Sequence, residues 1–373
     1  MKQLIFFDLH YFCLETVITE IEYLEKYSSN INYIFYLSSE IKPTLIQQVK
    51  FDKCFNFKGA HFILHKKNKV PRFISKFMML MNLRKKNADA LMLHGLVKSM
   101  DIVITRWILG KPTKIILQNH GERPFKNIFK RWAQKLANTC IDTYLFVSKE
   151  QSNIWIEKRV ISKEKKVVEV MEGSTTFQFT NQRANKQNGE RAEIINLLWV
   201  GRLDKNKDPL CALEALYQFK ERGGRFKLQM IYSTNDLELE VIKFIGSKNL
   251  KTVVELLGEV EHEKLEQFYN RTDYFISASH SEGSGYALCE AMACGCVPIV
   301  TNIPSFKAML DNGECGYLYE PGNPSQLANI LCSLKEIDFE IQSKKVMKKF
   351  QDDLSFEAIG KKISQTILGL SEI

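Results

Sequence analysis

Short apolar runs alternate with helical patterns along most of the chain, and this alternation restricts the possible folds more than any other feature. The runs are rich in Ile, Phe and Val, as expected for buried strands. They are Leu4–Phe7, Ile31–Leu37, Ala90–Leu93, Ile115–Leu117, Thr143–Val147 and Val167–Val170, then Ile194–Val200, Phe226–Tyr232, Val253–Leu257, Tyr274–Ile276, Val297–Val300 and Gly316–Tyr319. Such alternation predicts parallel, doubly wound α/β sheets, whose ligands bind beyond the carboxyl ends of the strands.

A polar stretch from Thr180 to Glu190 divides the alternation into two halves, since its only apolar side chain is that of Ala184. We predict an interdomain linker there. The expected domains are residues 1–180 and 191–345, followed by C-terminal helices over 346–373. A length of 373 residues also favours two domains.

Composition points to a reducing compartment and to no membrane span. The nine cysteines are odd in number and have no C-x-x-C spacing, so we interpret them as small core residues and expect neither disulfides nor a zinc site. The first apolar run ends at Asp8, and no apolar run approaches about 20 residues. A cytoplasmic protein is expected, or one that is peripheral at the inner face of the membrane.

Positive charge is concentrated in the first half of the chain. Residues 1–180 contain 29 Lys and Arg against 16 Asp and Glu, and between 51 and 86 ten basic residues accompany the single acid Asp52. The segment 65–86 combines basic clusters with apolar residues. Two interpretations stay open, an amphipathic helix with a solvated basic face and a helix on an anionic membrane surface.

A glycine-rich loop lies between a strand and a helix in the second half, at Ser281-Glu282-Gly283-Ser284-Gly285. From Tyr286 the pattern is helical, and Gly295 can end the helix. Backbone N–H groups at such a helix start bind anions, and glycines let a phosphate approach the backbone closely, so the loop favours a diphosphate. Glu282 precedes the helix and Glu290 lies more than one turn inside it, so we interpret them as acceptors for hydroxyl groups on different parts of one ligand.

The segment Ser-Glu-Gly-x-Gly, followed by Glu-Ala-Met-Ala-x-Gly-x-Pro-Ile-Val, resembles the signature of retaining glycosyltransferases of family 4. The resemblance implies the GT-B fold, with two Rossmann-like doubly wound domains facing a central cleft and a C-terminal helix that crosses back to the N-terminal domain. It also implies that Glu282 lies beside the donor sugar and that Glu290 holds the ribose. A vicinal diol would satisfy both oxygens of a buried carboxylate.

Further motifs extend the resemblance over most of the chain. Val200-Gly201-Arg202-Leu203, with Lys207 five residues after Arg202, resembles the turn whose Arg and Lys clamp the donor diphosphate. Segments at 312–324 and 353–356 also match the family. The resemblance implies further ligand contacts, with the diphosphate at Gly283, Ser284, Gly285, Tyr286 and Ala287, and with the nucleoside at Gly258 and Val260.

The first half matches the family more loosely. His120, in Gln118-Asn119-His120-Gly121, falls where many members place a histidine against the donor sugar, and His10 and His94 occupy comparable strand ends. Two segments depart from the family pattern, at Phe7–Tyr11 and at Tyr232–Asp236. They put in doubt the N-terminal contact with the sugar phosphate and the form of the base pocket.

The resemblance implies a metal-independent hexosyltransferase. It would move a sugar from a UDP- or GDP-sugar to a hydroxyl acceptor, a glycan or a lipid-linked sugar, in the biosynthesis of cell-surface polysaccharide or glycolipid. No cofactor is expected, and no Asp-x-Asp pair is present to hold a metal against a diphosphate. Two other classes stay open, a catalytically impaired GT-B partner subunit and a nucleic-acid-binding protein, although the aromatic stacking surface expected of the latter is absent.

Overall fold

The computed structural model describes residues 3–8, 31–37, 60–64, 77, 80, 81, 84, 85, 89–96, 99–180 and 194–369, with the backbone alone in the first three ranges. All of the predicted linker except Thr180, His10 with its neighbours, and most of the segment 65–86 lie outside these residues. The chain divides into two compact units, Met1–Gly173 with Phe356–Ile373, and Ser174–Ser355. The sequence prediction placed the corresponding boundaries at 180, 191 and 346.

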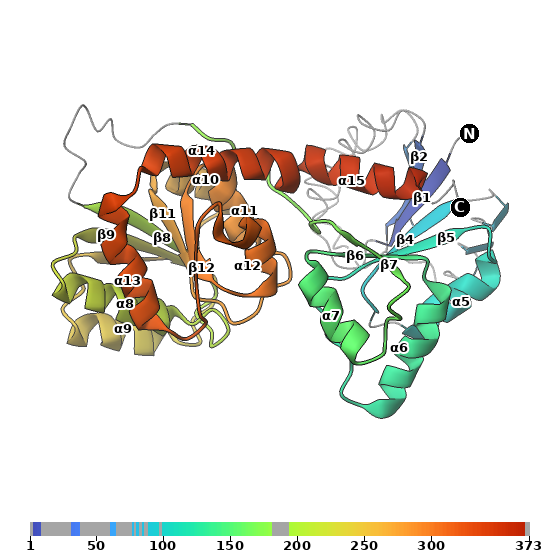
Figure 1. Ribbon diagram of the computed structural model, residues 1–373, viewed down its shortest axis with the longest axis horizontal. Helices are drawn as coiled ribbons and strands as arrows, with labels where there is room; N and C mark the ends of the chain where they lie inside the picture. Colours follow the sequence, from blue (N-terminus) through green and yellow to red (C-terminus); the bar gives the residue numbers. More distant parts are fainter. Residues whose placement is uncertain are drawn as a thin grey trace. The chain divides into compact units, whose positions relative to one another are not determined.

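The N-terminal unit contains a parallel sheet with helices packed on it (Figure 1). Within the described residues its strands have the order β3-β2-β1-β4-β5-β6-β7. They are β1 (Gln3–Asp8), β2 (Ile31–Leu37), β3 (Ala60–Leu64), β4 (Ala90–His94), β5 (Lys114–Gln118), β6 (Thr143–Phe146) and β7 (Lys166–Glu169). The helices are α5 (Ser99–Leu109), α6 (Ile128–Cys140), α7 (Lys149–Glu157) and α15 (Phe356–Leu368). Strand β3 was not predicted, since its short apolar run lies within the basic stretch 51–86.

The C-terminal unit is built in the same way. In the described part of the chain its parallel strands have the order β10-β9-β8-β11-β12-β13. They are β8 (Ile195–Gly201), β9 (Phe226–Tyr232), β10 (Val254–Gly258), β11 (Tyr274–Ser277), β12 (Val297–Thr301) and β13 (Tyr317–Tyr319). The helices are α8 (Pro209–Glu221), α9 (Glu238–Ser247), α10 (His262–Arg271), α11 (Tyr286–Ala293), α12 (Pro304–Met309), α13 (Pro324–Ser333) and α14 (Phe339–Lys349), with short turns η2 (Asp311–Gly313), η3 (Leu334–Glu336) and η4 (Phe350–Leu354). The predicted strands of this unit are all present.

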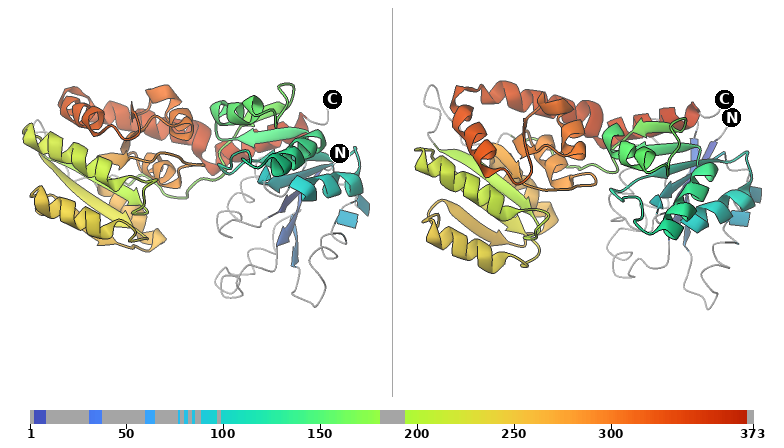
Figure 2. Two further views of the ribbon diagram at one scale, coloured as in Figure 1. Left: turned by 90° about the horizontal axis from the view of Figure 1, so that it is seen from below. Right: turned by 60° about the horizontal axis from the view of Figure 1, so that its bottom comes forward.

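Helices cover both faces of the C-terminal sheet (Figure 2). Helices α8, α9 and α13 pack together in one layer, and α10, α11 and α14 pack in the other. The core between the first layer and the sheet contains Trp199, Leu216 and Met230, all fully buried. Strands β11 and β12 are buried along their whole length, which explains why they appear in the sequence as continuous apolar runs rather than alternating ones.

Local sequence signals fix where several helices begin. Helix α8 begins with Pro209, which suits a first helical position because its missing N–H would have no partner there. The preceding Asp208 accepts a hydrogen bond from the backbone N–H of Cys211, at 3.2 Å. Helix α6 is capped by Asn127, whose side chain accepts from the N–H groups of Phe129 and Lys130.

The interpretation of the cysteines as core residues is confirmed for those that the structure describes. All seven are free, and six of them are buried. Burial raises the pKa of the Cys289 thiol to about 12, so this side chain is a neutral packing group. As for membrane spans, none of the helices among the described residues is long and apolar enough to cross a bilayer.

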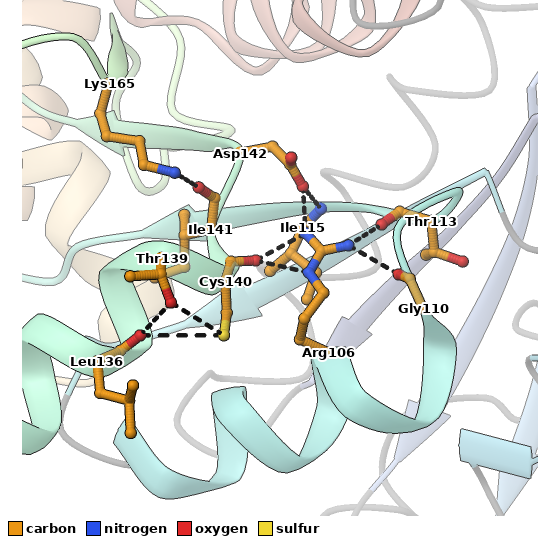
Figure 3. Close-up of polar contacts among 10 residues, drawn as sticks. All are labelled: Arg106, Gly110, Thr113, Ile115, Leu136, Thr139, Cys140, Ile141, Asp142 and Lys165. Carbon is orange, nitrogen blue, oxygen red and sulfur yellow. Dashed lines mark hydrogen bonds and ion pairs between the residues drawn. The ribbon is translucent and has the colours of Figure 1, made fainter.

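A partly buried guanidinium joins three elements of the N-terminal unit (Figure 3). Arg106, on α5, donates to the carbonyl oxygens of Gly110 and Thr113 at 2.9 and 2.6 Å and twice to that of Cys140 at 2.9 and 2.7 Å. It also forms an ion pair with Asp142, whose carboxylate accepts from the N–H of Ile115 at 2.7 Å. One side chain therefore satisfies carbonyls at the ends of α5 and α6 and ties both helices to β5.

Replacing Arg106 by methionine should destabilise this unit by about 3 kcal/mol, because three carbonyls lose this donor and the Asp142 carboxylate loses its cationic partner. Urea denaturation, followed by far-UV circular dichroism, should show a lower midpoint for Arg106→Met. The control is Lys111→Met, which removes an exposed cation from the next turn. Equal midpoints for the two variants would mean that Arg106 does not hold these elements together.

Candidate functional site

The strand order of each sheet reverses at one point, and the carboxyl ends of the strands beside that point form the usual ligand site of such sheets. In the C-terminal unit the reversal lies between β8 and β11. The loop after β8 contains Arg202 and Lys207, and the loop after β11 contains Glu282 and the glycines. Asn206 joins the two loops, since its carbonyl accepts from the N–H of His280 at 2.8 Å and its side chain donates to the carbonyl of Ser281 at 2.9 Å.

The glycine-rich loop leads directly into α11, as the sequence predicts. Gly285 is the residue before the helix and has φ of 66°, a conformation that favours glycine. A Cβ atom there would lie 2.6 Å from the ring of Phe306, so a larger residue would collide with α12. Gly285 has no side chain and supplies no side-chain cap to the first turn of α11.

Lys207 and Glu282 form an ion pair at this switch point. Both are largely enclosed, with 19% and 13% of their side-chain surfaces exposed. Arg202 is more open, at 56%, and pairs with Asp204 at 3.1 Å. The sequence placed Lys207 and Glu282 at one ligand but did not predict their contact. An ammonium group has three donors, so Lys207 can hold Glu282 and still bind an anion.

Glu290 lies inside α11 and is buried. The hydroxyl of Tyr269 donates to one of its oxygens at 2.9 Å, and Nε2 of His262 contacts the other at 2.7 Å. Burial and the charge of Glu290 raise the pKa of Tyr269 well above its ordinary value, so the phenol stays a donor. The sequence analysis assigned both carboxylate oxygens of Glu290 to the diol of a ribose. The structure shows that each oxygen already has a protein donor, and a ligand hydroxyl would use a second lone pair.

The proposed nucleoside contacts lie at the same edge of the sheet. Gly258 ends β10 with φ of 68°, and Val260 follows two residues later. His262, at the start of α10, stacks on the ring of Phe177 with centroids 5.0 Å apart. This edge therefore combines backbone groups with an aromatic pair near the Glu290 carboxylate.

His120 lies in a polar cluster of the N-terminal unit, beyond the carboxyl end of β5. Its Nδ1 is paired with Glu172, and its Nε2 lies 2.9 Å from Nδ1 of His94. An ionised carboxylate only accepts, so His120 carries a proton on Nδ1. Burial, and then the charge of His120, lower the pKa of His94 well below its ordinary value, so His94 is a neutral imidazole.

Glu122 is a further member of this cluster. Its carboxylate accepts from the backbone N–H of His120 and from the side chain of Asn119, both at 2.9 Å. Burial is the main cause that raises the pKa of Glu122. Gly95 lies beside it with φ of 77°, a conformation that favours glycine, and a Cβ at that position would force the Glu122 carboxylate to shift.

Sequence reasoning missed Glu172 and Glu122 as partners of His120. Glu172 lies three residues after β7, and an acid just past the carboxyl end of a predicted strand was the signal that could have identified it. Among the described residues, no group of three or more His, Cys, Asp or Glu side chains is arranged to hold a metal ion.

Comparison with known proteins agrees with the fold and places part of the chain in a known family match. Residues 180–350 match the family model described as glycosyl transferases group 1. The GDP-mannose:cellobiosyl-diphosphopolyprenol alpha-mannosyltransferase of Xanthomonas campestris is 27% identical to this chain. The match covers 62% of this chain and 61% of that relative's length. The amylovoran biosynthesis glycosyltransferase AmsK of Erwinia amylovora is 29% identical over 39% of this chain and 37% of its own length.

Solved structures resemble the chain over nearly all of its length. A glycosyltransferase from Rickettsia africae has a TM-score of 0.71 at 18% identity, covering 98% of this chain and 99% of that one. HepE of Anabaena, solved in complex with UDP, has a TM-score of 0.71 at 15% identity and full coverage of both chains. The chain therefore has the GT-B fold, and its residues 180–350 match the glycosyl transferases group 1 family.

Proposed function

We propose that this protein is a retaining, metal-independent glycosyltransferase that moves a sugar from a nucleotide-diphosphate donor to a hydroxyl acceptor. The observation that carries the proposal is the enclosed Lys207–Glu282 pair, which lies at the switch point beside the glycine-rich start of α11. Lys207, Arg202 and the N–H groups of the loop supply positive charge for a diphosphate, while Glu282 faces hydroxyl groups of the sugar.

The reaction follows from these charges. The acceptor oxygen bonds to the anomeric carbon on the face from which the diphosphate departs, and the acceptor proton passes to a phosphate oxygen. Lys207 and Arg202 compensate the charge that develops on the leaving diphosphate. Glu282 is a poor nucleophile for a covalent intermediate because Lys207 neutralises it, and this favours transfer on one face.

The relatives suggest which donors and acceptors to test. The Xanthomonas protein is named for GDP-mannose and a diphosphopolyprenol-linked disaccharide, and HepE was solved with UDP. We therefore propose a UDP- or GDP-sugar as donor and a glycan or lipid-linked sugar as acceptor, in the cytoplasm, for cell-surface polysaccharide or glycolipid biosynthesis. The role of the segment 65–86 at a membrane stays a prediction.

Donor hydrolysis in excess chelator tests this function without a known acceptor. Purified protein is incubated with a panel of UDP- and GDP-sugars, and release of the nucleoside diphosphate is followed. We expect release from at least one donor, unchanged by the chelator, because protein cations take the place of a metal. Strict dependence on a divalent ion would refute the proposal that protein cations alone balance the charge of the diphosphate. Binding of a donor with no release under any condition would favour the impaired partner subunit.

Replacing Glu290 by glutamine should weaken binding of the preferred nucleoside diphosphate about 30-fold, since a charged acceptor for the ribose becomes neutral. Titration calorimetry measures the change. Glu263→Gln, on the exposed side of α10, is the matched control. The nucleotide lacking its ribose 2′- and 3′-hydroxyls should bind the wild-type protein and Glu290→Gln equally. If the two proteins differ greatly in affinity for that nucleotide, the ribose is not the partner of Glu290.

A further inference from the structure

Two neighbouring helices of the N-terminal unit expose large apolar side chains. Helices α5 and α6 pack against each other and are adjacent in each view of Figures 1 and 2. Exposed fractions reach 80% for Trp107, 72% for Ile128, 81% for Phe129 and 64% for Trp132. Met100 and Ile104 are about half exposed. Several large apolar side chains exposed on two packed helices indicate an interaction site.

The spacing of these residues places them on defined helix faces. On α5, Met100, Ile104 and Trp107 follow an i, i+4, i+7 pattern, opposite the buried side chains that face the core. On α6, Ile128 and Trp132 lie one turn apart, and the buried residues of this helix begin only at Gln134. The first half of α6 therefore extends beyond the core and exposes its apolar side.

The segment that carries these apolar side chains has an excess of positive charge. Residues 99–140 contain the basic residues Arg106, Lys111, Lys114, Arg123, Lys126, Lys130, Arg131 and Lys135. The only acids in this range are Asp101 and Glu122. The Glu122 carboxylate binds the His120 and Asn119 groups, and Lys111, Lys126, Lys130 and Lys135 are exposed. The surface is therefore apolar and cationic at once.

We propose that this α5–α6 surface, formed by Met100, Ile104, Trp107, Ile128, Phe129, Trp132 and the four exposed lysines, binds an anionic membrane. Trp and Phe enter the boundary between headgroups and acyl chains, while lysines meet lipid phosphates, and helices of this composition lie in the membrane plane. A protein partner fits less well, since lysine is depleted in protein interfaces.

Helix α9 also exposes an apolar side chain, but the charges beside it have the opposite sign. Leu239, on α9, is 80% exposed, but Glu238 and Glu240 flank it. An anionic surface would repel that helix. The proposal concerns residues other than the segment 65–86 and stands apart from the transfer reaction, so either can fail alone.

Tryptophan fluorescence gives a direct test, because the four tryptophans divide evenly. Trp107 and Trp132 belong to the surface, whereas Trp155 and Trp199 are buried in the two units. Vesicles that contain phosphatidylglycerol should shift the emission of the wild-type protein to shorter wavelength and protect it from acrylamide. The double variant Trp107→Phe and Trp132→Phe should show neither effect. Vesicles of phosphatidylcholine alone should give a much weaker response.

Cosedimentation then measures affinity. Replacing Lys111, Lys126, Lys130 and Lys135 by glutamine should lower the partition coefficient about a hundredfold, even if only some of them reach the phosphates. Trp107→Ser with Phe129→Ser should lower it at least about tenfold. The control Leu239→Ser with Ile242→Ser should bind like the wild type, and circular dichroism checks that every variant is folded.

Three results would overturn the proposal. The first is no emission shift with anionic vesicles, which would assign the surface to a protein partner. The second is binding that the lysine and apolar variants leave unchanged. The third is binding that falls only when Lys66, Lys67, Lys69, Lys85 and Lys86 are neutralised, which would assign it to the segment 65–86.

Discussion

Replacing Lys207 by alanine should lower the rate of donor turnover about 10³-fold. The side chain is the more enclosed of the two proposed diphosphate cations, and it is also the partner of Glu282. Its loss removes positive charge from the developing leaving group and leaves an enclosed carboxylate unpaired near an anionic donor. Donor hydrolysis at saturating and limiting donor separates kcat from kcat/KM.

Two variants separate these effects. Lys205→Ala removes an exposed lysine from the same loop and should leave turnover unchanged. Lys207→Ala combined with Glu282→Gln removes the unpaired carboxylate, so nucleotide binding should partly recover while turnover stays low. Full activity in Lys207→Ala would show that this pair is structural and would end its assignment to the diphosphate.

Replacing His120 by alanine should lower turnover about 10²-fold or more while nucleoside diphosphate affinity stays near that of the wild type. The family resemblance predicts that this side chain contacts the donor sugar, and contacts that strengthen in the transition state affect kcat. Glu172→Gln should have a smaller effect in the same direction. Glutamine can donate to Nδ1 and so favours the tautomer with the proton on Nε2, opposite to the form that Glu172 holds.

The ¹⁵N chemical shifts of the His120 ring report this tautomer and would not change if Glu172 only supported the fold. Glu164→Gln, an exposed acid of the same unit, is the control. Nucleotide affinity that falls together with turnover in His120→Ala would move the histidine from the sugar to the nucleotide. A wild-type rate in His120→Ala would exclude it from the reaction.

Local pattern was sufficient to predict most of the fold. Buried parallel strands appear as apolar runs, and the loop before α11 has a glycine, Gly285, where φ is positive, so both are visible in the sequence. Strand β3 was missed because a short run at a sheet edge, within basic residues, has no such contrast.

The site was predictable in its residues but not in its contacts. The sequence supplied Lys207, Glu282 and Glu290, whereas the pairs Lys207–Glu282, Tyr269–Glu290 and His120–Glu172 join residues 75, 21 and 52 positions apart. Such pairs depend on how loops and helices that follow different strands come together in the folded unit. No periodicity within one segment reports that convergence.

The most direct test of the central claim is ¹H NMR of transfer from an α-linked nucleotide sugar to methanol, in excess chelator. Methanol serves as a minimal hydroxyl acceptor, and the methyl glycoside preserves the anomeric configuration at which it forms. We predict the α-methyl glycoside together with one equivalent of nucleoside diphosphate, and loss of both in Lys207→Ala. Formation of the β-methyl glycoside would contradict retention. A folded protein that consumes none of the UDP- or GDP-sugars would contradict the proposed activity itself.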